Sequence, residues 1–202
     1  MKKILIASNN PGKLQTARFV FTEKDNFQLF TPSDLNISLE VEETGTTYEQ
    51  NALLKAEAFS KLVPKDFHVI ADDSGINVDA LPGQLGVKSR RFGAGPDASD
   101  QEWLDHFLQA VSHVTEPQER SSSMQTTTCL ITDQGPLYFH GKLHGFITFE
   151  AKHPITKGLP FSSVFLIPQE DKVIAALDYE TKSKYSHRID SYRQVAEYLK
   201  KL

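Results

Sequence analysis

Apolar and polar positions repeat with two different periods along the first part of the chain. Residues 3–7 contain a short apolar run, Ile4 to Ala7, that predicts a buried strand, and residues 11–21 carry apolar positions three and four apart, which predicts a helix. Residues 37–41 alternate between apolar and polar side chains, as a second strand does, and the apolar residues 68–71 predict a third. Strands and helices that alternate in this way favour the α/β class.

Capping boxes mark the starts of two further helices, because a threonine or serine followed three residues later by glutamate satisfies the first backbone amides of a helix. Thr46 and Glu49 form the first box, which predicts a helix that continues to about Val63. Ser99 and Glu102 form the second box, and an apolar stripe of helical spacing follows it.

The second half of the chain contains one long hairpin pattern. Residues 124–132 and 137–149 have the character of strands around a short turn, and residues 163–167 are a further strand candidate. Residues 187–200 carry a helical apolar stripe. The chain shows no internal repeat and no linker, so we expect a single α/β domain over residues 1–202.

Composition places the chain among globular proteins. Its 202 residues are 39% hydrophobic and 24% charged, which is close to the average and argues against disorder. The apolar runs are shorter than the about 18 residues that suggest a membrane helix, and the run before Ser8 is shorter than the core of a signal peptide. One cysteine, Cys129, excludes a disulfide within the chain, so we expect a cytoplasmic protein without a membrane partner.

The charge argues against one class of partner. The chain has 22 basic and 26 acidic residues and a formal net charge of −4. Proteins that bind nucleic acid usually carry a basic face or stripe, so we expect no nucleic-acid partner. Local basic residues remain able to bind a small phosphate ligand.

The first candidate site is the turn between the first predicted strand and helix, residues 8–13. Asn10 suits the N-cap and Pro11 the first helical position. We expect the amides of Gly12 and Lys13 to be free there, and free amides at a helix N-terminus bind anions. Lys13 at this end opposes the helix dipole, a conflict that a bound phosphate would remove. An ordinary turn with an exposed lysine fits the segment equally well.

Acidic residues form the second candidate site. Asp72 and Asp73 directly follow the apolar residues 68–71. If the two carboxylates stand at the end of a regular strand, their side chains point to opposite faces, so we expect one of them to lead. Carboxylates that meet a phosphate substrate suit Mg²⁺. Residues 42–45 add two glutamates, although acidic residues are common before a helix. The aspartate pair, taken alone, also fits a surface turn.

A basic segment, residues 182–188, is the third candidate. Lys182, His187 and Arg188 suit several contacts to a polyanion or to the edge of a base. A charged helix start is the simpler interpretation of this segment alone. Acidic side chains that can bind a cation and basic side chains that can bind phosphates are together the groups needed for Mg²⁺-assisted phosphoanhydride chemistry.

Five segments that keep their order along nearly the whole chain resemble the inosine triphosphate pyrophosphatase family, which removes deaminated purine nucleotides. They are residues 8–13, 42–45 with 49–56, 71–81, 86–92, and 182 with 186–188. The resemblance implies an α/β fold with an elongated mixed sheet, flanking helices and two lobes around a central cleft, in a homodimer. It also implies Mg²⁺-dependent hydrolysis of deaminated purine triphosphates (ITP, dITP, XTP) to a nucleoside monophosphate and pyrophosphate.

The resemblance further implies a role for each matching residue. Glu43 and Asp73 would hold the metal ion, Asp73 would act as general base on water, and Asp72 would support both. The side chains that would contact the polyphosphate are Ser8, Asn10, Lys13, Lys55 and Ser74. Those that would approach the nucleotide and its base are Lys182, His187 and Arg188.

One block departs from the family pattern. Where the family has Gly-Phe-Gly-Tyr/Trp-Asp-Pro-x-Phe, residues 158–165 are Gly-Leu-Pro-Phe-Ser-Ser-Val-Phe. Leu159 replaces the stacking aromatic residue and Ser162 replaces the acid that contacts the base, and Phe161 is the third candidate for base contact. Three functions therefore stay open: hydrolysis of deaminated purine triphosphates, the same chemistry on a different or broader nucleotide set, and nucleotide binding without catalysis.

Overall fold

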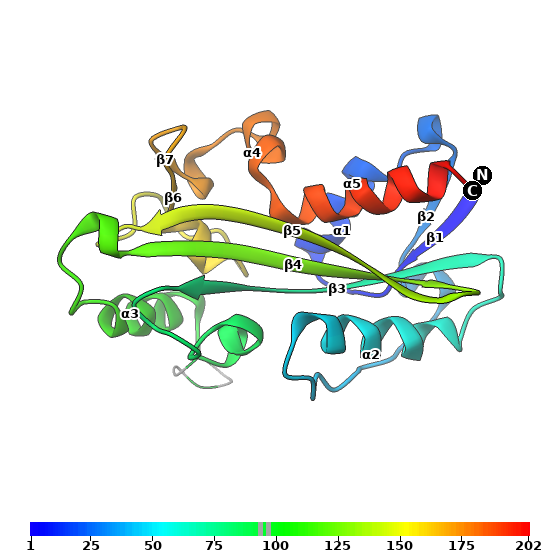
Figure 1. Ribbon diagram of the computed structural model, residues 1–202, viewed down its shortest axis with the longest axis horizontal. Coiled ribbons are helices and arrows are strands. Elements are labelled where there is room, and N and C mark those ends of the chain that lie inside the picture. The colour runs from blue at the N-terminus through cyan, green and yellow to red at the C-terminus, as the bar shows by residue number, and fades with distance from the viewer. Residues whose placement is uncertain (93–94, 96–97) are drawn as a thin grey trace. The chain divides into compact units, whose positions relative to one another are not determined.

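The computed structural model describes residues 1–92, 95 and 98–202, without the side chains of residues 90 and 91. Helices and strands alternate in the first part of the chain, and long strands dominate the middle (Figure 1). In chain order, the elements are β1 (Lys2–Ile6), α1 (Pro11–Val20), β2 (Phe27–Phe30), α2 (Tyr48–Ser60), β3 (Phe67–Val78), α3 (Asp100–Ala110), β4 (Ser121–Thr132), β5 (Gly135–Ile147), β6 (Phe165–Ile167), β7 (Lys172–Val173), α4 (Tyr179–Tyr185) and α5 (His187–Lys200).

The strands form one mixed sheet in the order β2-β1-β3-β4-β5-β6-β7. β1 pairs in parallel with β2 and with β3, and helical crossovers make both connections possible. β6 pairs antiparallel with β5 and with β7. The α/β class and the mixed sheet with flanking helices are therefore confirmed. Within the described part of the chain, no helix has the length and apolar character needed to cross a bilayer.

The chain divides into two compact units. The first comprises residues 1–74, 126–141 and 187–202, and the second comprises residues 75–125 and 142–186. The single domain over residues 1–202 and the central cleft stay predictions.

Two apolar cores in the first unit follow from the alternation of side chains along its strands. Even-numbered positions such as Ile4 and Ile70 are 0% exposed and pack with α1 and α5. Odd-numbered positions such as Leu5 and Val69, 0% and 2% exposed, pack with α2. In this unit α1 and α5 consequently lie on one side of the strands and α2 on the other (Figure 1). Adjacent residues of β3 therefore face different helices.

The core of the second unit forms around α3. The stripe predicted for this helix is buried, with Leu104, Phe107 and Val111 all 0% exposed. The predicted capping box at Ser99 and Glu102 is present at its start. Phe161 packs edge-on against the α3 side chain of Trp103, with ring centroids 4.0 Å apart, and also against Phe107.

Several local predictions are confirmed to within a few residues. They include the first strand and helix, the helix at residues 187–200, and the strands of the hairpin. The helix expected from Thr46 exists, but its N-cap is Thr47, whose side chain accepts a hydrogen bond from the Gln50 amide, while Thr46 pairs with the Gln50 side chain. The helix ends at Ser60 rather than at about residue 63.

One strand prediction is wrong, and a second places the end of a correctly predicted strand too early. Residues 37–41 alternate between half-buried and exposed side chains, as their pattern indicates, but they form no ladder; Ile37, Leu39 and Val41 instead cover the core beside α2. The strand predicted at residues 68–71 continues to Val78, so the aspartate pair lies inside β3 and not at its end.

Candidate active site

The two adjacent aspartates of β3 are both buried, with Asp72 2% and Asp73 6% exposed. Their side chains leave opposite faces of the strand, as expected for neighbours in extended chain. Asp72 interacts with residues of α1 and α5, and Asp73 with residues of α2. Each carboxylate therefore has its own hydrogen-bonding partners.

Asp72 is surrounded by donors of hydrogen bonds. Its Oδ2 lies 3.0 Å from Lys13 Nζ and 3.3 Å from Arg188 Nε, and its Oδ1 accepts a hydrogen bond from the Tyr192 hydroxyl at 2.8 Å. Arg188 also donates through Nη2 to Ser74 Oγ at 2.8 Å. Burial raises the pKa of Asp72, but the charges of Lys13 and Arg188 outweigh it and hold that pKa well below its usual range. Asp72 is therefore a permanent anion that orients two cations.

The start of α1 departs from the sequence prediction in one respect. Asn10 is the N-cap and Pro11 the first helical residue, as predicted, but Asn10 Oδ1 accepts hydrogen bonds from the amides of Gly12 and Lys13 at 2.9 and 3.2 Å. These amides are not free, because the asparagine cap satisfies both. The Ser8 hydroxyl in turn accepts a hydrogen bond from the Asn10 amide.

Lys13 extends from this helix start to the aspartate on β3. Its ammonium donates to the carbonyl oxygen of Asp72 at 2.9 Å as well as contacting the carboxylate. Asp72 thus supplies the negative charge that the unfavourable position of Lys13 on the helix requires. Desolvation lowers the pKa of Lys13, and the attraction of Asp72 opposes that shift.

Asp73 is oriented through a buried asparagine of α2. Asn51 is 0% exposed, and its Oδ1 accepts a hydrogen bond from the Gly45 amide at 2.7 Å, so its Nδ2 is the atom that donates to Asp73 Oδ2, at 2.9 Å. A Cβ atom on Gly45 would lie 2.5 Å from Asn51 Oδ1, so this close approach requires glycine. The loop before α2 therefore determines the direction of the Asp73 carboxylate.

Lys55 lies between the second carboxylate and a glutamate. Its Nζ is 2.6 Å from Glu43 Oε1 and 3.9 Å from Asp73 Oδ1. Desolvation raises the pKa of Asp73, while Lys55 and the Asn51 hydrogen bond oppose the rise. A carboxylate whose pKa is raised accepts a proton more readily at neutral pH, which suits a general base.

Glu43 and Asp73 fit a magnesium ion by the chemistry of their donors. Mg²⁺ is commonly held by one or two carboxylates together with waters and substrate phosphates. No group of three or more histidine, cysteine, aspartate or glutamate side chains is placed to hold a metal ion in the described residues. The two-carboxylate set therefore suits a cation that the substrate helps to bind.

His187 begins α5, next to Arg188. Desolvation, followed by the repulsion of Arg188, lowers the pKa of the half-buried His187 to about 3. The imidazole is therefore neutral at pH 7 and suits a hydrogen bond to a base rather than an ion pair with a phosphate. Gly141 of β5 lies so close to the His187 carbonyl that any side chain there would collide with it.

The remaining candidates lie in the second unit. Leu159 is 45% exposed, and Ser162 is 8% exposed with its hydroxyl donating to the Leu159 carbonyl at 2.7 Å. Phe161 belongs to the aromatic cluster on α3. The Lys182 ammonium lies 3.5 Å from the Ala175 carbonyl. The structure brings Leu159, Phe161 and Ser162 together in one turn.

Two residues of the site have no role in the sequence analysis. Asn51 and Tyr192 each contact one of the aspartates. Asn51 stands four residues before Lys55, so both lie on one face of a helix. This spacing is the sequence feature that could have placed Asn51 in the site beside Lys55. Tyr192 lies in the apolar stripe of the last helix, and a buried tyrosine hydroxyl usually has a hydrogen-bond partner.

Comparison with solved structures finds close neighbours of this fold. The Staphylococcus aureus Ham1 protein is 33% identical, with a TM-score of 0.84 and 99% of each chain covered. A HAM1 protein from Coxiella burnetii is 28% identical, with a TM-score of 0.85 and 100% of each chain covered. The fold of this chain is therefore similar to that of these solved structures over nearly its whole length.

Curated relatives match the chain over nearly its full length. A dITP/XTP pyrophosphatase of Staphylococcus aureus (strain MRSA252) is 34% identical, covering 98% of this chain and 97% of its own. A dITP/XTP pyrophosphatase of Bacillus subtilis (strain 168) is 32% identical, covering 98% of each. The resemblance inferred from the sequence segments is thus confirmed. The model of the Ham1 family matches residues 4–198, and the chain belongs to that family.

Proposed function

We propose that this protein hydrolyses deaminated purine nucleoside triphosphates to a nucleoside monophosphate and pyrophosphate, with Mg²⁺. The names of the relatives support the reaction and the substrate class. The observation that carries the proposal is the aspartate pair of β3, in which Asp72 orients two cations and Asp73 shares a lysine with a glutamate. One strand thus carries both the aspartate that orients the cations for a polyphosphate and the aspartate proposed as metal ligand and general base.

Asp73 acts as the general base in this proposal. In this proposal water attacks the α-phosphorus, the bond from that phosphorus to the bridging oxygen breaks and pyrophosphate leaves, and the proton lost by the water passes to the Asp73 carboxylate. The raised pKa of Asp73 favours this transfer near neutral pH. Asn51 holds one carboxylate oxygen through its Nδ2, so the carboxylate keeps a single direction.

The cations of the first unit bind the polyphosphate. Lys13 and Arg188 are oriented by Asp72, and Lys55 by Glu43 and Asp73. These three cations stabilise the negative charge that gathers on the leaving pyrophosphate. A magnesium ion held by Glu43 and Asp73 would supply further charge neutralisation to the phosphates.

The nucleobase of the substrate is the less constrained part of the proposal. Leu159 offers apolar area without the π-face of an aromatic ring, and the Ser162 hydroxyl already donates to the Leu159 carbonyl. Discrimination between bases depends on polar groups that one base satisfies and another does not. The same chemistry on a broader nucleotide set is therefore the second candidate function.

A pyrophosphate-release assay tests the proposal. Purified protein is incubated with ITP, dITP, XTP, GTP and ATP, with and without Mg²⁺. We expect Mg²⁺-dependent release of pyrophosphate and monophosphate in equal amounts, with the deaminated purines among the substrates. Binding of the triphosphates without any release would instead support a non-catalytic nucleotide-binding protein.

The proposal includes a homodimer in the cytoplasm, as the family resemblance implies. The mass of the purified protein, measured by light scattering during size-exclusion chromatography, should correspond to two chains. A mass of 22.7 kDa, which is that of one chain, would contradict the homodimer.

A further inference from the structure

We propose that Lys55 competes with the divalent cation for Glu43 and Asp73. In this inference, the ammonium takes the place of the cation between the two carboxylates, and cation binding releases it to the triphosphate. The inference rests on the proposed function, because it assigns the cation to these two residues. It adds an internal switch that couples the two ligands.

The geometry of Lys55 carries the inference. Its Nζ lies 2.6 Å from Glu43 Oε1 and 3.9 Å from Asp73 Oδ1, and its side chain is 12% exposed. Asp73 Oδ2 accepts a hydrogen bond from Asn51 Nδ2 and Oδ1 accepts one from the Ser74 amide at 2.8 Å, so each oxygen has one protein donor. A carboxylate oxygen has a second lone pair, and the oxygen that faces the lysine is Oδ1. A cation that bridges Glu43 and Asp73 would therefore use the oxygens that Lys55 approaches.

The charges make simultaneous occupation unfavourable. One ammonium leaves the two carboxylates with a net charge of −1, whereas an ammonium and a divalent cation together would leave +1. Two cations within a few ångströms repel one another, and water screens them little on the side of Lys55 and Asp73, whose side chains are 12% and 9% exposed. The cation and the lysine thus exclude one another at these oxygens.

Release of the lysine gives the exclusion a function. An ammonium that leaves the carboxylates becomes available to a phosphate oxygen, which it binds through charge-assisted hydrogen bonds. Cation binding then strengthens triphosphate binding, and by reciprocity the triphosphate strengthens cation binding to the same extent. The enzyme would consequently bind either ligand alone more weakly than both together.

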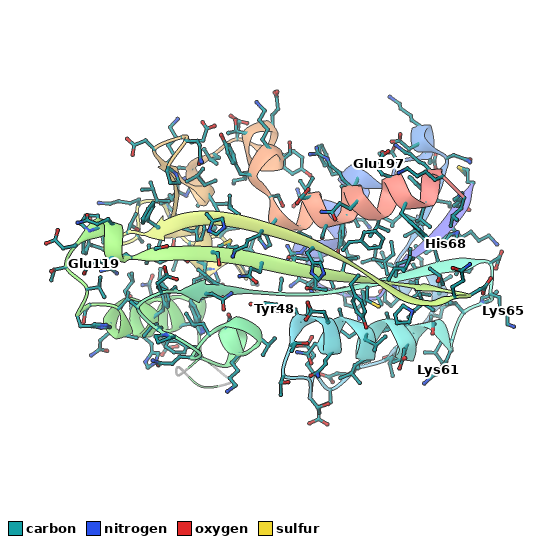
Figure 2. The ribbon with its side chains drawn as sticks, in the orientation of Figure 1. Tyr48, Lys61, Lys65, His68, Glu119 and Glu197 are labelled. Carbon is teal, nitrogen blue, oxygen red and sulfur yellow. The ribbon has the colours of Figure 1, made fainter. Side chains whose placement is uncertain are left out.

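The test measures cation binding in the absence of nucleotide. The full chain is stripped of metal with EDTA and titrated with Mn²⁺, the bound ion being measured by electron paramagnetic resonance. The variants are Lys55→Met and Lys55→Arg, with Lys61→Met as the matched control. Lys61 is an exposed lysine at the end of α2, and its side chain points away from the strands (Figure 2).

We expect Lys55→Met to bind Mn²⁺ about tenfold or more tightly than wild type, because the competing charge is gone. Lys55→Arg keeps the charge, so it should bind Mn²⁺ as weakly as wild type, and Lys61→Met should match wild type. Equal affinities of Lys55→Met and wild type would overturn the inference, as would the absence of Mn²⁺ binding to both.

A second measurement uses the wild-type protein. The ¹⁵N-ammonium resonance of Lys55 should shift when Mg²⁺ is added, and an unchanged resonance at saturating Mg²⁺ would also overturn the inference. Neither measurement needs turnover. Failure of the proposed function, seen as no pyrophosphate release by wild type, is therefore distinguishable from failure of the lysine competition.

Discussion

Replacing Tyr192 by phenylalanine removes one oxygen atom from the interior of the first unit. The tyrosine is 0% exposed, and its hydroxyl donates to Asp72 Oδ1 at 2.8 Å. Phenylalanine keeps the ring and its packing, so the change isolates the hydrogen bond. Asp72 stays buried and charged but loses the donor to one of its two oxygens.

The magnitude follows from the charge of the acceptor. A hydrogen bond to a charged group contributes about 1.5–3 kcal/mol to stability. For a chain of 202 residues, each kcal/mol corresponds to about 2–4 °C in melting temperature. We therefore expect Tyr192→Phe to melt about 3–12 °C below wild type at pH 7.

The loss should depend on pH in one direction. The pKa of Asp72 is held below the unfolded value of about 3.9, so its contribution to stability is complete above that pH and declines as the pH falls towards the folded pKa. Removing the hydroxyl raises the folded pKa, because a donor to the charged form is lost. The difference between the proteins is therefore constant while Asp72 is charged in both folded proteins, and it shrinks only as the pH falls through the folded pKa of the variant.

Calorimetric melting curves of both proteins between pH 3 and pH 7 would measure these effects. The control is Tyr198→Phe, which removes a hydroxyl from the same helix where the ring packs against Phe139. A melting temperature unchanged in Tyr192→Phe, or lowered equally in Tyr198→Phe, would refute the reasoning. So would a difference that grows as the pH falls.

Further predictions concern turnover and substrate choice. Asp73→Asn should lower kcat about 10²–10⁴-fold with little change in melting temperature, and wild-type kcat should fall as the pH drops through the raised pKa of Asp73; near wild-type rates in the variant would contradict its role as base. Lys13→Ala should raise KM by a similar factor for ITP, XTP, GTP and ATP, and a loss confined to one base would place the lysine elsewhere. Leu159→Phe combined with Ser162→Asp should raise the ratio of kcat/KM for ITP over ATP, and unchanged selectivity would show that other residues contact the base. Gly45→Ala should lower kcat by displacing the side chain that orients Asp73, whereas unchanged kinetics would show that the loop adapts.

Predictions that rest on local chemistry agree with the structure, apart from the cap at Thr46 and the free amides at the start of α1. The cap at Asn10 and the box at Ser99 and Glu102 depend on side chains within three residues of the amides that they satisfy. The apolar stripes of α1 and α5 depend only on helical spacing. Such features are visible in the sequence because their partners are close in the sequence.

Predictions that need distant partners are less successful. Residues 37–41 have the alternation of a strand, but alternation reports one buried side and not a neighbouring strand. β2 (Phe27–Phe30) pairs with β1 over only four residues, which is too short for a clear pattern. Lys13 turns towards Asp72, 59 residues away along the chain, and no spacing within the helix indicates that contact.

The aspartate pair shows why neighbours in a strand can perform different tasks. Successive side chains of a strand point to opposite faces, so Asp72 and Asp73 enter two separate environments although they share a peptide bond. Both are buried, and burial raises the pKa of each; the cations at Asp72 outweigh this effect, whereas those at Asp73 do not. Two carboxylates whose pKa values are moved apart can take different parts in acid–base chemistry. Asp72 then keeps its charge and orients cations, and Asp73 is the carboxylate able to receive a proton from water.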